Sequence, residues 1–536
     1  MQLKASDFFV DLHFPACGID LSRGFDRQPN RPMQNGKYAR TTPMGVNVRA
    51  FDPSTGRARG GQRAALARYI NERVSGAHLI QLLDSLTVVG YTAPGGGVQS
   101  SQSGRVVTLV AVSQGNIRVA DAGATSWTTP TNGNGALNAS GTIFSASNQQ
   151  KLYFADGTNY KLYNPATNSV EAWVATAGAL PVDSAGNTPR LIETWRGRTV
   201  QAGIFGDPHN WFMPKVGDPS NFDYAPPSPS AIDAVAGNNS DLGRVGDVIT
   251  SLVPFSDDVL FFGGDHTLWV MRGDPLAGGQ LDRVSDSIGM AWGRPWCKDP
   301  EGSIYFVSNR MGIYKLERNS FPQRVSQTIE QLAATVNTGD NTISLAWDDR
   351  FQGLHIFVTE TAGPSASTHF FFEIRTGAWW TDSFANNNHN PLCAVVFDGN
   401  QLEDRVTLFG SWDGYVRFLD PAATKDDFTA IESSVVIGPL LTADMDQIRL
   451  MELIGVLAEG SGEVEYAILV GNTAEEALAS DAVETGTWEA GRNSAAAIRQ
   501  SAHAIYVKLT ASSPWAMESI RAKIRGTGKV AARSHS

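Results

Sequence analysis

One short phrase recurs along this chain in several variants. Each copy is an apolar run, a turn rich in Asp, Asn and Gly, and a second apolar run that carries an aromatic residue. The four clearest copies are residues 152–165, 260–275, 304–316 and 407–421. A run, a tight turn and a second run of this kind predict a β-hairpin.

The spacing of the copies constrains the fold further. Their equivalent aromatics Phe154, Phe262, Phe306 and Phe409 lie 108, 44 and 103 residues apart, which fits a repeat of about 50 residues. Weaker copies fill the gaps, at 106–119, 200–212 and 355–372. We therefore expect a mainly β chain with a β-propeller of six or seven blades over roughly residues 100–425. The alternative is an irregular run of hairpins in a large sandwich.

The two ends of the chain differ from this middle part. Residues 464–470, 505–509 and 520–524 alternate apolar and polar positions, which predicts a C-terminal β-sandwich, and Thr473 with Glu476 forms a capping-box pattern for a short helix. Residues 62–74 have the apolar spacing of a helix, and the glycine-rich stretch 95–104 is typical of a linker. The expected division is an N-terminal platform segment at 1–100, the propeller at 101–428, the sandwich at 429–529 and a flexible tail at 530–536.

Residues 21–80 are strongly basic in a chain whose net charge is −11. This asymmetry favours a surface that docks an acidic protein partner. The candidate docking residues are Arg49, Arg57, Arg59 and Arg63. Contact with nucleic acid and a plain solvated strip are the alternatives.

The sequence offers little catalytic chemistry. It has no HExxH, no Walker A loop and no GxSxG elbow, so we expect no enzyme, no cofactor and no metal site. The three cysteines have no CxxC spacing, which argues against a disulfide framework. No signal peptide is visible and no apolar run reaches the ~20 residues that span a bilayer, so no membrane insertion is predicted.

Several phrases between residues 45 and 425 resemble the tail nozzle (tail tubular protein B-like) proteins of short-tailed bacteriophages and the related DNA-stabilising hub proteins. The phrases that carry the resemblance are 47–53, 60–63, 196–223, 258–275, 296–302, 347–353 and 375–380. None of them is a catalytic motif. The resemblance rests on the overall pattern and is weaker at both ends of the chain.

The resemblance implies a structural virion protein, made in the bacterial cytoplasm and located in the tail. Such proteins form a hexameric ring below the portal–adaptor complex, carry tail fibres or spikes, and extend and close the channel through which double-stranded DNA passes. The net acidity fits a conduit that does not bind phosphates. The alternative is a propeller that binds a host receptor or a glycan.

A nozzle also needs a gate, which we expect in loops because loops can move while blades stay rigid. Two long polar loops between predicted blades are the candidates. The first is the proline-rich insertion 214–239, with Pro214, Pro219, Pro226 and Pro227, and the second is the loop 385–391, with Asn388 and His389. Both loops could equally decorate the outer surface.

Overall fold

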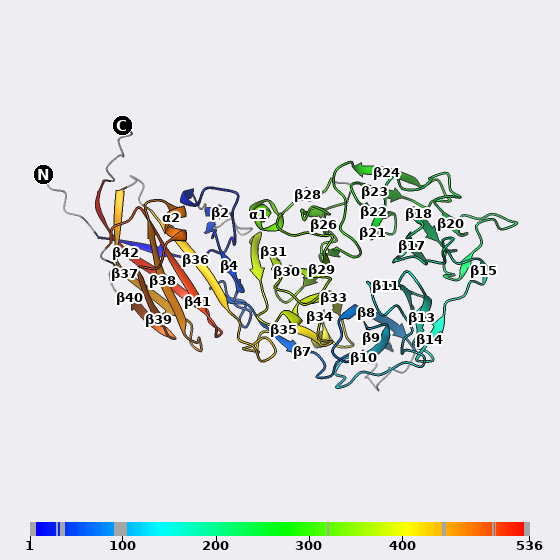
Figure 1. The fold of residues 1–536 in the computed structure, drawn as a ribbon, viewed down its shortest axis with the longest axis horizontal. Helices are drawn as coiled ribbons and strands as arrows, with labels where there is room; N and C mark the ends of the chain where they lie inside the picture. Colours follow the sequence, from blue (N-terminus) through cyan, green and yellow to red (C-terminus); the bar gives the residue numbers. More distant parts are fainter. Residues whose placement is uncertain are drawn as a thin grey trace.

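The computed structural model describes residues 7–27, 30–32, 38–90, 104–318, 321–441, 446–495, 498 and 500–529. They form an elongated molecule with two bodies, a ring of β-sheets and a β-sandwich, as Figure 1 shows. The first and the last described strands, β1 (Asp7–Leu12) and β42 (Met517–Lys529), both lie in the sandwich. The expected fold class, a β-propeller with a platform of N-terminal segment and C-terminal sandwich, is confirmed.

The described residues of the ring form seven blades, each a sheet whose strands follow one another antiparallel. Blade one consists of β8 (Ile80–Val89), β9 (Arg105–Ser113) and β10 (Asn116–Asp121), and blade two of β11 (Phe144–Asn148), β12 (Lys151–Ala155), β13 (Tyr160–Asn164) and β14 (Ser169–Ala172). Blade three consists of β16 (Leu191–Trp195), β17 (Arg198–Ile204), β18 (Asp207–Met213) and β20 (Val235–Ala236). Blade four consists of β21 (Ile249–Ser256), β22 (Val259–Gly264), β23 (Leu268–Arg272) and β24 (Gln280–Ser285).

Blades five to seven follow the same plan. They consist of β25 (Trp296–Lys298), β26 (Ile304–Val307), β27 (Ile313–Leu316) and β28 (Gln323–Arg324); β29 (Asn341–Asp348), β30 (Gly353–Glu360), β31 (His369–Glu373) and β32 (Ala378–Asp382); and β33 (Pro391–Phe397), β34 (Val406–Ser411), β35 (Val416–Asp420) and β7 (Ala65–Arg68).

The last blade closes the ring. Its outer strand β7 comes from the N-terminal part of the chain and pairs with β35, from Arg68 opposite Arg417 to Ala65 opposite Asp420. The chain then enters β8, the first strand of blade one, which packs against β33 of blade seven. The first and last blades are therefore joined through one short segment of chain.

Every copy of the recurring phrase is the second and third strand of one blade. The four clear copies are β12–β13, β22–β23, β26–β27 and β34–β35, and the three weak ones are β9–β10, β17–β18 and β30–β31. Phe154, Phe262, Phe306 and Phe409 are at most 1% exposed. Burial of a phenylalanine side chain contributes roughly 1.5–3 kcal/mol, so the repeat marks the packing between blades.

Tight turns of the type that suits twisted hairpins connect several first and second strands. At the turn between β16 and β17, Arg196 and Gly197 have φ values of 50° and 71°. Positive φ at both central residues defines a type I′ turn, whose twist matches that of the flanking strands. The arrangement explains why the blades need so little chain between these strands.

The structure corrects two expectations in the N-terminal region. The helix predicted over residues 62–74 is wrong, because β7 and a series of bends occupy that segment. The propeller takes in β7 and β8, so its boundary lies near residue 65 and not at 101. The linker predicted at 95–104 lies almost wholly outside the described residues, as does the tail at 530–536.

The platform, defined here as β1–β6 with β36–β42, is a sandwich built from both ends of the chain. Its strands are β1 (Asp7–Leu12), β2 (Asn30–Pro32), β3 (Tyr38–Arg40), β4 (Gly45–Val46), β5 (Val48–Arg49), β6 (Gly61–Gln62), β36 (Ser433–Leu440), β37 (Asp446–Leu457), β38 (Val464–Gly471), β39 (Glu484–Trp488), β40 (Gly491–Ala495), β41 (Ala504–Ala511) and β42 (Met517–Lys529). One sheet has the order β1-β42-β37-β40, and the other contains β4-β36-β41-β38-β39.

Blade six and the second platform sheet are a single sheet of nine strands. Thr381 at the outer strand of blade six pairs in parallel with Val46 of β4, and Val46 pairs with Ser434 of β36. Trp380 and Phe371 of blade six are fully buried in the same hydrophobic cluster as the platform residues Val435 and Leu453. The two bodies therefore share a core and a hydrogen-bonded sheet.

Helices are few and short in the described parts of the chain. They are η1 (Phe25–Arg27), η2 (Gln327–Ile329), α1 (Glu330–Ala333), η3 (Asn387–His389), η4 (Leu402–Asp404) and α2 (Ala474–Ala479). The capping box predicted at α2 is confirmed in part: the Thr473 side chain accepts a hydrogen bond from the Glu476 N–H, while the Glu476 carboxylate accepts from the N–H of Asn472, one residue before the cap. None of these helices is long and apolar enough to cross a bilayer.

Candidate functional site

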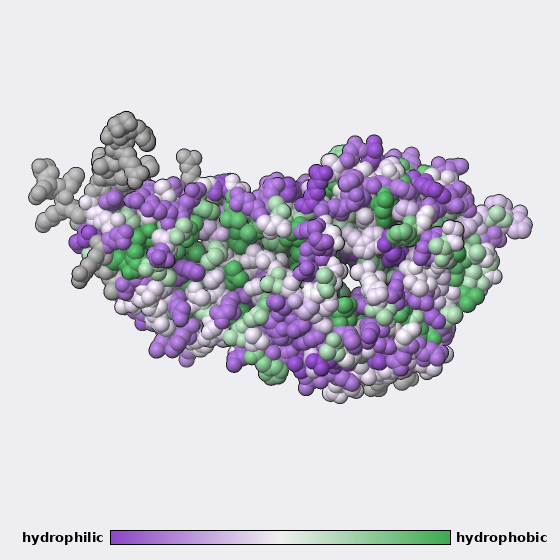
Figure 2. All heavy atoms as spheres, viewed as in Figure 1, coloured by the Kyte–Doolittle hydropathy of each residue, from purple (hydrophilic) through white to green (hydrophobic). Residues whose placement is uncertain are grey.

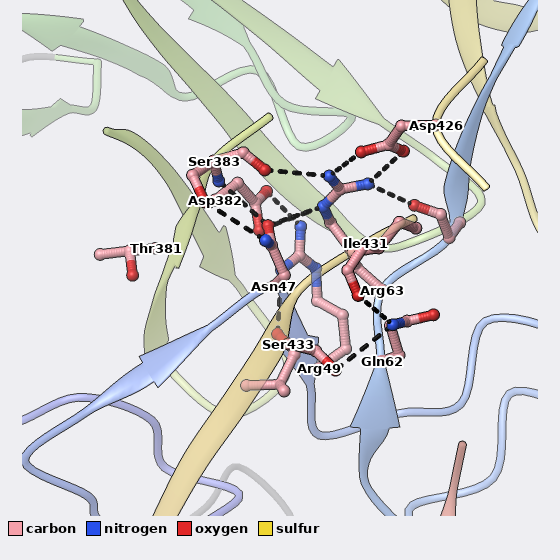
Figure 3. A network of polar contacts seen from close by, with 12 residues as sticks. Asn47, Arg49, Gln62, Arg63, Thr381, Asp382, Ser383, Asp426, Ile431 and Ser433 are labelled. Carbon is pink, nitrogen blue, oxygen red and sulfur yellow. Dashed lines mark hydrogen bonds and ion pairs between the residues drawn. The ribbon is translucent and has the colours of Figure 1, made fainter. Parts of the chain in front are cut away.

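A buried polar network joins the platform to the propeller (Figure 3). Arg49 of β5 donates two hydrogen bonds to Asp382 at the end of blade six, at 2.8 and 2.6 Å. Its guanidinium lies 4.0 Å from the centre of the Phe371 ring. Burial alone would raise the pKa of Asp382, but attraction and hydrogen bonds from Arg49 lower it to about 2, so the pair is ionised at neutral pH.

A second pair lies beside the first. Arg63 donates to both carboxylate oxygens of Asp426, at 2.9 and 2.5 Å, and its Nε donates to Asn47 Oδ1 at 2.9 Å. Burial alone would lower the pKa of Arg63, but Asp426 raises it above its usual value. Asn47, at φ 55°, also accepts from the Ser383 N–H and donates to the Glu432 carbonyl. One side chain thus bridges blade six, β36 and Arg63.

These contacts change the interpretation of the four candidate docking residues. Arg49 and Arg63 are 5% and 3% exposed and hold the junction together, so the expectation that they dock a partner is wrong. Arg59 binds Asp52 and Glu518, which ties the 52–59 loop to β42. Arg57 is exposed. The burial of Arg49 and Arg63 could have been predicted from the residues next to them in the sequence, because Val48, Ala50, Ala64 and Ala65 are apolar.

The first candidate gate loop belongs to the outer strands of one blade. The insertion 214–239 connects β18 to β20 within blade three, not two blades, and its short strand β19 (Asn221–Phe222) pairs with β15 (Ala177–Gly178). Both strands lie at the rim farthest from the platform in Figure 1. The fully buried Arg198 donates to the carbonyls of Pro214, Ala231 and Asp233, which fixes the base of the loop.

The prolines of that insertion differ in exposure. Pro214 and Pro219 are buried, Pro226 is half-buried and Pro227 is exposed. In the second loop, His389 is 2% exposed and belongs to the single turn η3, which the Asn386 side chain caps by accepting from the Asn388 N–H. Asn388 is exposed, and its backbone carbonyl accepts a hydrogen bond from the Trp412 N–H. None of these residues lines the cavity beside the 289–295 segment.

The segment that leads into blade five lies against the inner strands of several blades. Within residues 289–295, the Ala291 N–H donates to Val307 of blade five, and Trp292 Nε1 lies 3.4 Å from Thr142 Oγ1 beside blade two. Gly293, at φ 96°, approaches the Phe144 ring so closely that a Cβ there would lie 2.5 Å from Phe144 Cζ. The segment therefore crosses from blades four and five to blade two.

A charged cluster accompanies this crossing. Arg294 Nε donates to Glu193 of blade three at 2.7 Å, and its NH2 donates to the Ser145 carbonyl of blade two at 2.7 Å. Asp84 of blade one lies 3.9 Å from the same guanidinium. Burial raises the pKa of Glu193 to about 7, with Arg294 opposing and Asp84 adding to the shift. One arginine thus joins the inner strands of three blades.

Beside this segment lies a cavity of about 220 Å³. Its walls come from blades one, two, six and seven and from the crossing segment, including Leu82, Phe144, Asn341, Leu392 and Trp292. A space of this size holds a few water molecules or one small organic molecule.

Three side chains have the spacing of metal ligands, but an arginine already bridges two of them. His389, Asp413 and Asp427 bring ligand atoms together, but the buried Arg417 donates to both carboxylates, at 2.6 and 2.6 Å. Burial and the nearby Arg417 lower the pKa of His389. Arg68 Nε also donates to Asp427, at 2.9 Å, so two guanidiniums balance the two carboxylates and the cluster is a structural ion-pair network.

Comparison with known proteins gives no family. No protein-family model matches the chain, and no curated protein matches it in sequence. Similar solved structures include the extracellular domain of a hybrid two component system from B. thetaiotaomicron (10% identity, TM-score 0.42, covering 68% of this chain and 40% of that one). They also include YCF48 bound to D1 peptide (12%, 0.37, 66% and 96%) and BBS1N in complex with ARL6DN (8%, 0.40, 67% and 99%).

The chain thus spans less than half the length of the first of these structures. At such identities and TM-scores the similarities carry no argument about function. The fold assignment rests on the strand order of the seven blades.

Proposed function

We propose that this chain is a non-catalytic structural subunit of a short-tailed phage tail, in which the platform builds a nozzle ring below the portal–adaptor complex and the propeller forms its wall. The observation that carries the proposal is the junction. A continuous sheet and two buried, bidentate Arg–Asp pairs connect the two bodies. A subunit that closes a pressurised channel needs such a fixed angle between the part that assembles and the part that forms the wall.

The interior of the propeller supports the same proposal. The 289–295 segment bridges the inner strands of the propeller and the cavity beside it holds only about 220 Å³, so we place the DNA conduit between subunits, as in a ring. Most of the net negative charge lies in the propeller residues, whereas the platform is nearly neutral. A wall of acidic propellers around the lumen would let DNA slide past without binding its phosphates.

The test is the number of copies in an isolated tail. Mass measurement of the tail complex, together with electron microscopy of its lower part, should give six copies in a ring with the platforms toward the portal. A copy number that is not a multiple of six would contradict the proposal. A ring in which the propellers face the portal would contradict the assigned role of the platform.

A second candidate function is binding of a host receptor or a glycan by the propeller. It is favoured by the exposed apolar residues at the rim farthest from the platform, where Val174, Val182 and Phe205 are 65%, 56% and 74% exposed. Figure 2 shows hydrophobic residues gathered there, over β14 and β15. Residues 172–182 carry no charge, and Asp183 accepts from the Gly206 N–H, which brings Val182 toward Phe205.

Binding of the purified chain to host cells and to a panel of surface polysaccharides tests this second candidate. The variant Val174→Ser, Val182→Ser, Phe205→Ser should lose the binding while its circular dichroism spectrum stays unchanged. Equal binding by the variant would exclude the apolar rim as the receptor site.

A further inference from the structure

The two outer faces of the platform sandwich carry opposite charge. The first face belongs to the sheet β1-β42-β37-β40, and we call it the basic face. Along β42 the side chains of Arg521, Lys523 and Arg525 alternate with the core residues Ala522 and Ile524, so all three point outward. Arg449 of β37 lies opposite Arg525, and Arg492 of β40 is exposed at the far edge.

Among the described side chains of the basic face, the acidic ones are fewer than the cations. Asp11 lies opposite Arg521 and accepts from its Nε at 2.6 Å, and Glu452 lies opposite Lys523. Asp7 stands at the register position opposite Arg525. The exposed Phe9 lies in the same row, its ring centre 6.0 Å from the Arg521 guanidinium and 5.7 Å from the Lys523 ammonium. Arginine and phenylalanine are among the residues enriched where proteins dock.

The second face is formed by β38, β39 and α2 of the other sheet, and we call it the acidic face. Its exposed carboxylates are Glu463, Glu465, Glu475, Glu476, Asp481 and Glu489. Lys508 of β41, opposite Ala467 of β38, is a cation among them. Since the sheets of a sandwich pack through their inner faces, the basic and acidic faces look in opposite directions.

We propose that the basic face of one copy docks on the acidic face of a second copy. This inference rests on the proposed function and names the contact that would build its ring. A patch that meets a different patch on its neighbour makes a heterologous interface, and repetition of such an interface gives a closed ring or an open filament. Opposite charges fix both the partner and the orientation, because like faces repel each other.

Two observations favour a second copy over DNA as the occupant of the basic face. The cations of the basic face are spaced by carboxylates and Phe9, a mixed pattern that the acidic face, with Lys508 among its carboxylates, can match and a uniform row of phosphates cannot. The exposed Phe9 supplies apolar contact, which the neutral Ala467, Thr485 and Thr487 of the acidic face can match. The acidic propellers would also repel one another, which leaves the platforms as the surfaces that attract.

Charge reversal of each face tests the proposal. The basic-face variant is Arg492→Glu, Lys523→Glu, Arg525→Glu, and the acidic-face variant is Glu463→Lys, Glu465→Lys, Glu475→Lys. A matched control carries Arg244→Glu, Arg272→Glu and Arg283→Glu in the propeller, where the side chains are 49%, 44% and 53% exposed. Circular dichroism establishes that each variant is folded, and sedimentation velocity at several salt concentrations measures association of the full chain.

The wild type should associate at low salt and dissociate as salt screens the charges. Each single-face variant should associate at least about tenfold more weakly, because like charges then meet. The control should match the wild type, and the chain that carries all six platform substitutions should recover, since its two faces are again complementary.

Three outcomes would overturn the proposal. If both single-face variants associate as strongly as the wild type, these faces do not form the contact, although the proposed ring would not be contradicted. Binding of a DNA duplex that the basic-face variant loses, without any change in association, would make the face a nucleic-acid surface. A wild type that stays monomeric at low salt would also exclude the contact, and the copy number in isolated tails would then decide the ring separately.

Discussion

Removal of the Arg63 side chain should loosen the junction between platform and propeller. Arg63→Met deletes five donated hydrogen bonds while roughly keeping the volume of the side chain. Asp426 then remains buried with the Leu66 N–H as its donor. Removing one partner of a buried ion pair typically costs about 3–5 kcal/mol, which is a large share of the roughly 5–15 kcal/mol that stabilises a folded domain.

The double variant Arg63→Met, Asp426→Leu separates the cost of a stranded charge from the value of the pair. It leaves the Leu66 N–H without its acceptor, which costs about 1–3 kcal/mol, but it buries no unpaired charge. We therefore expect it to be more stable than Arg63→Met by about 2 kcal/mol, as found when buried pairs are replaced by apolar residues.

Hydrogen exchange with mass spectrometry is the suitable assay, because a molecule of two bodies need not unfold in one step. Peptides covering residues 45–52 and 378–384 should exchange faster in Arg63→Met, and peptides of blade four should not. The exposed Arg57→Met is the control and should stay within about 0.5 kcal/mol of the wild type. A cost below about 1 kcal/mol for Arg63→Met, or a double variant less stable than the single, would refute the reasoning.

Three further predictions concern single side chains. Asp382 has a folded pKa of about 2 against 3.8 for the free residue, so its contribution of about 2 kcal/mol is complete above pH 3.8 and is lost as the pH falls toward 2; acid unfolding curves of the wild type and Asp382→Asn should converge across that window. Glu193 has a raised pKa, so its contribution is complete below pH 4.5 and is lost as the pH rises through about 7; Glu193→Gln should abolish this part of the pH dependence of urea unfolding, and an unchanged pH profile would contradict the assignment. Gly293→Ala should cost about 1–3 kcal/mol more than Gly302→Ala in thermal unfolding, because both have positive φ but only the first meets a ring, that of Phe144.

The sequence predicts the propeller well because its signal is local. Each hairpin phrase lies within about 20 residues, and the alternation and turn residues that form it are adjacent in the chain. The helix predicted over residues 62–74 was wrong because the structure of that segment depends on a partner far away in the sequence. Leu66, Tyr69, Ile70 and Val74 have helical spacing, but Leu66 pairs with Leu419 of β35, a partner that no local pattern can indicate.

The junction could not be predicted for a similar reason. Arg49 and Arg63 count toward the basic charge of the N-terminal segment, yet their carboxylate partners Asp382 and Asp426 lie more than 300 residues away. Composition treats these charges as surface charges, whereas the fold pairs and buries them. The opposite charges of the two platform faces are likewise visible only after strand order is known.

The strand pairings that close the propeller and the platform determine when each part can fold during synthesis. The outer strand β7 cannot pair until β35 has been synthesised, and β1 cannot pair until β42 has been synthesised. In the second pairing, Arg521 of β42 lies 510 residues after its partner Asp11. At a ribosomal rate of about 5–20 residues per second, β1 stays without its partner for roughly half a minute to two minutes. The propeller can close only after β35 has emerged, and the platform only after β42 has emerged. The basic face, which contains β1 and β42, therefore forms later in synthesis than the ring of blades.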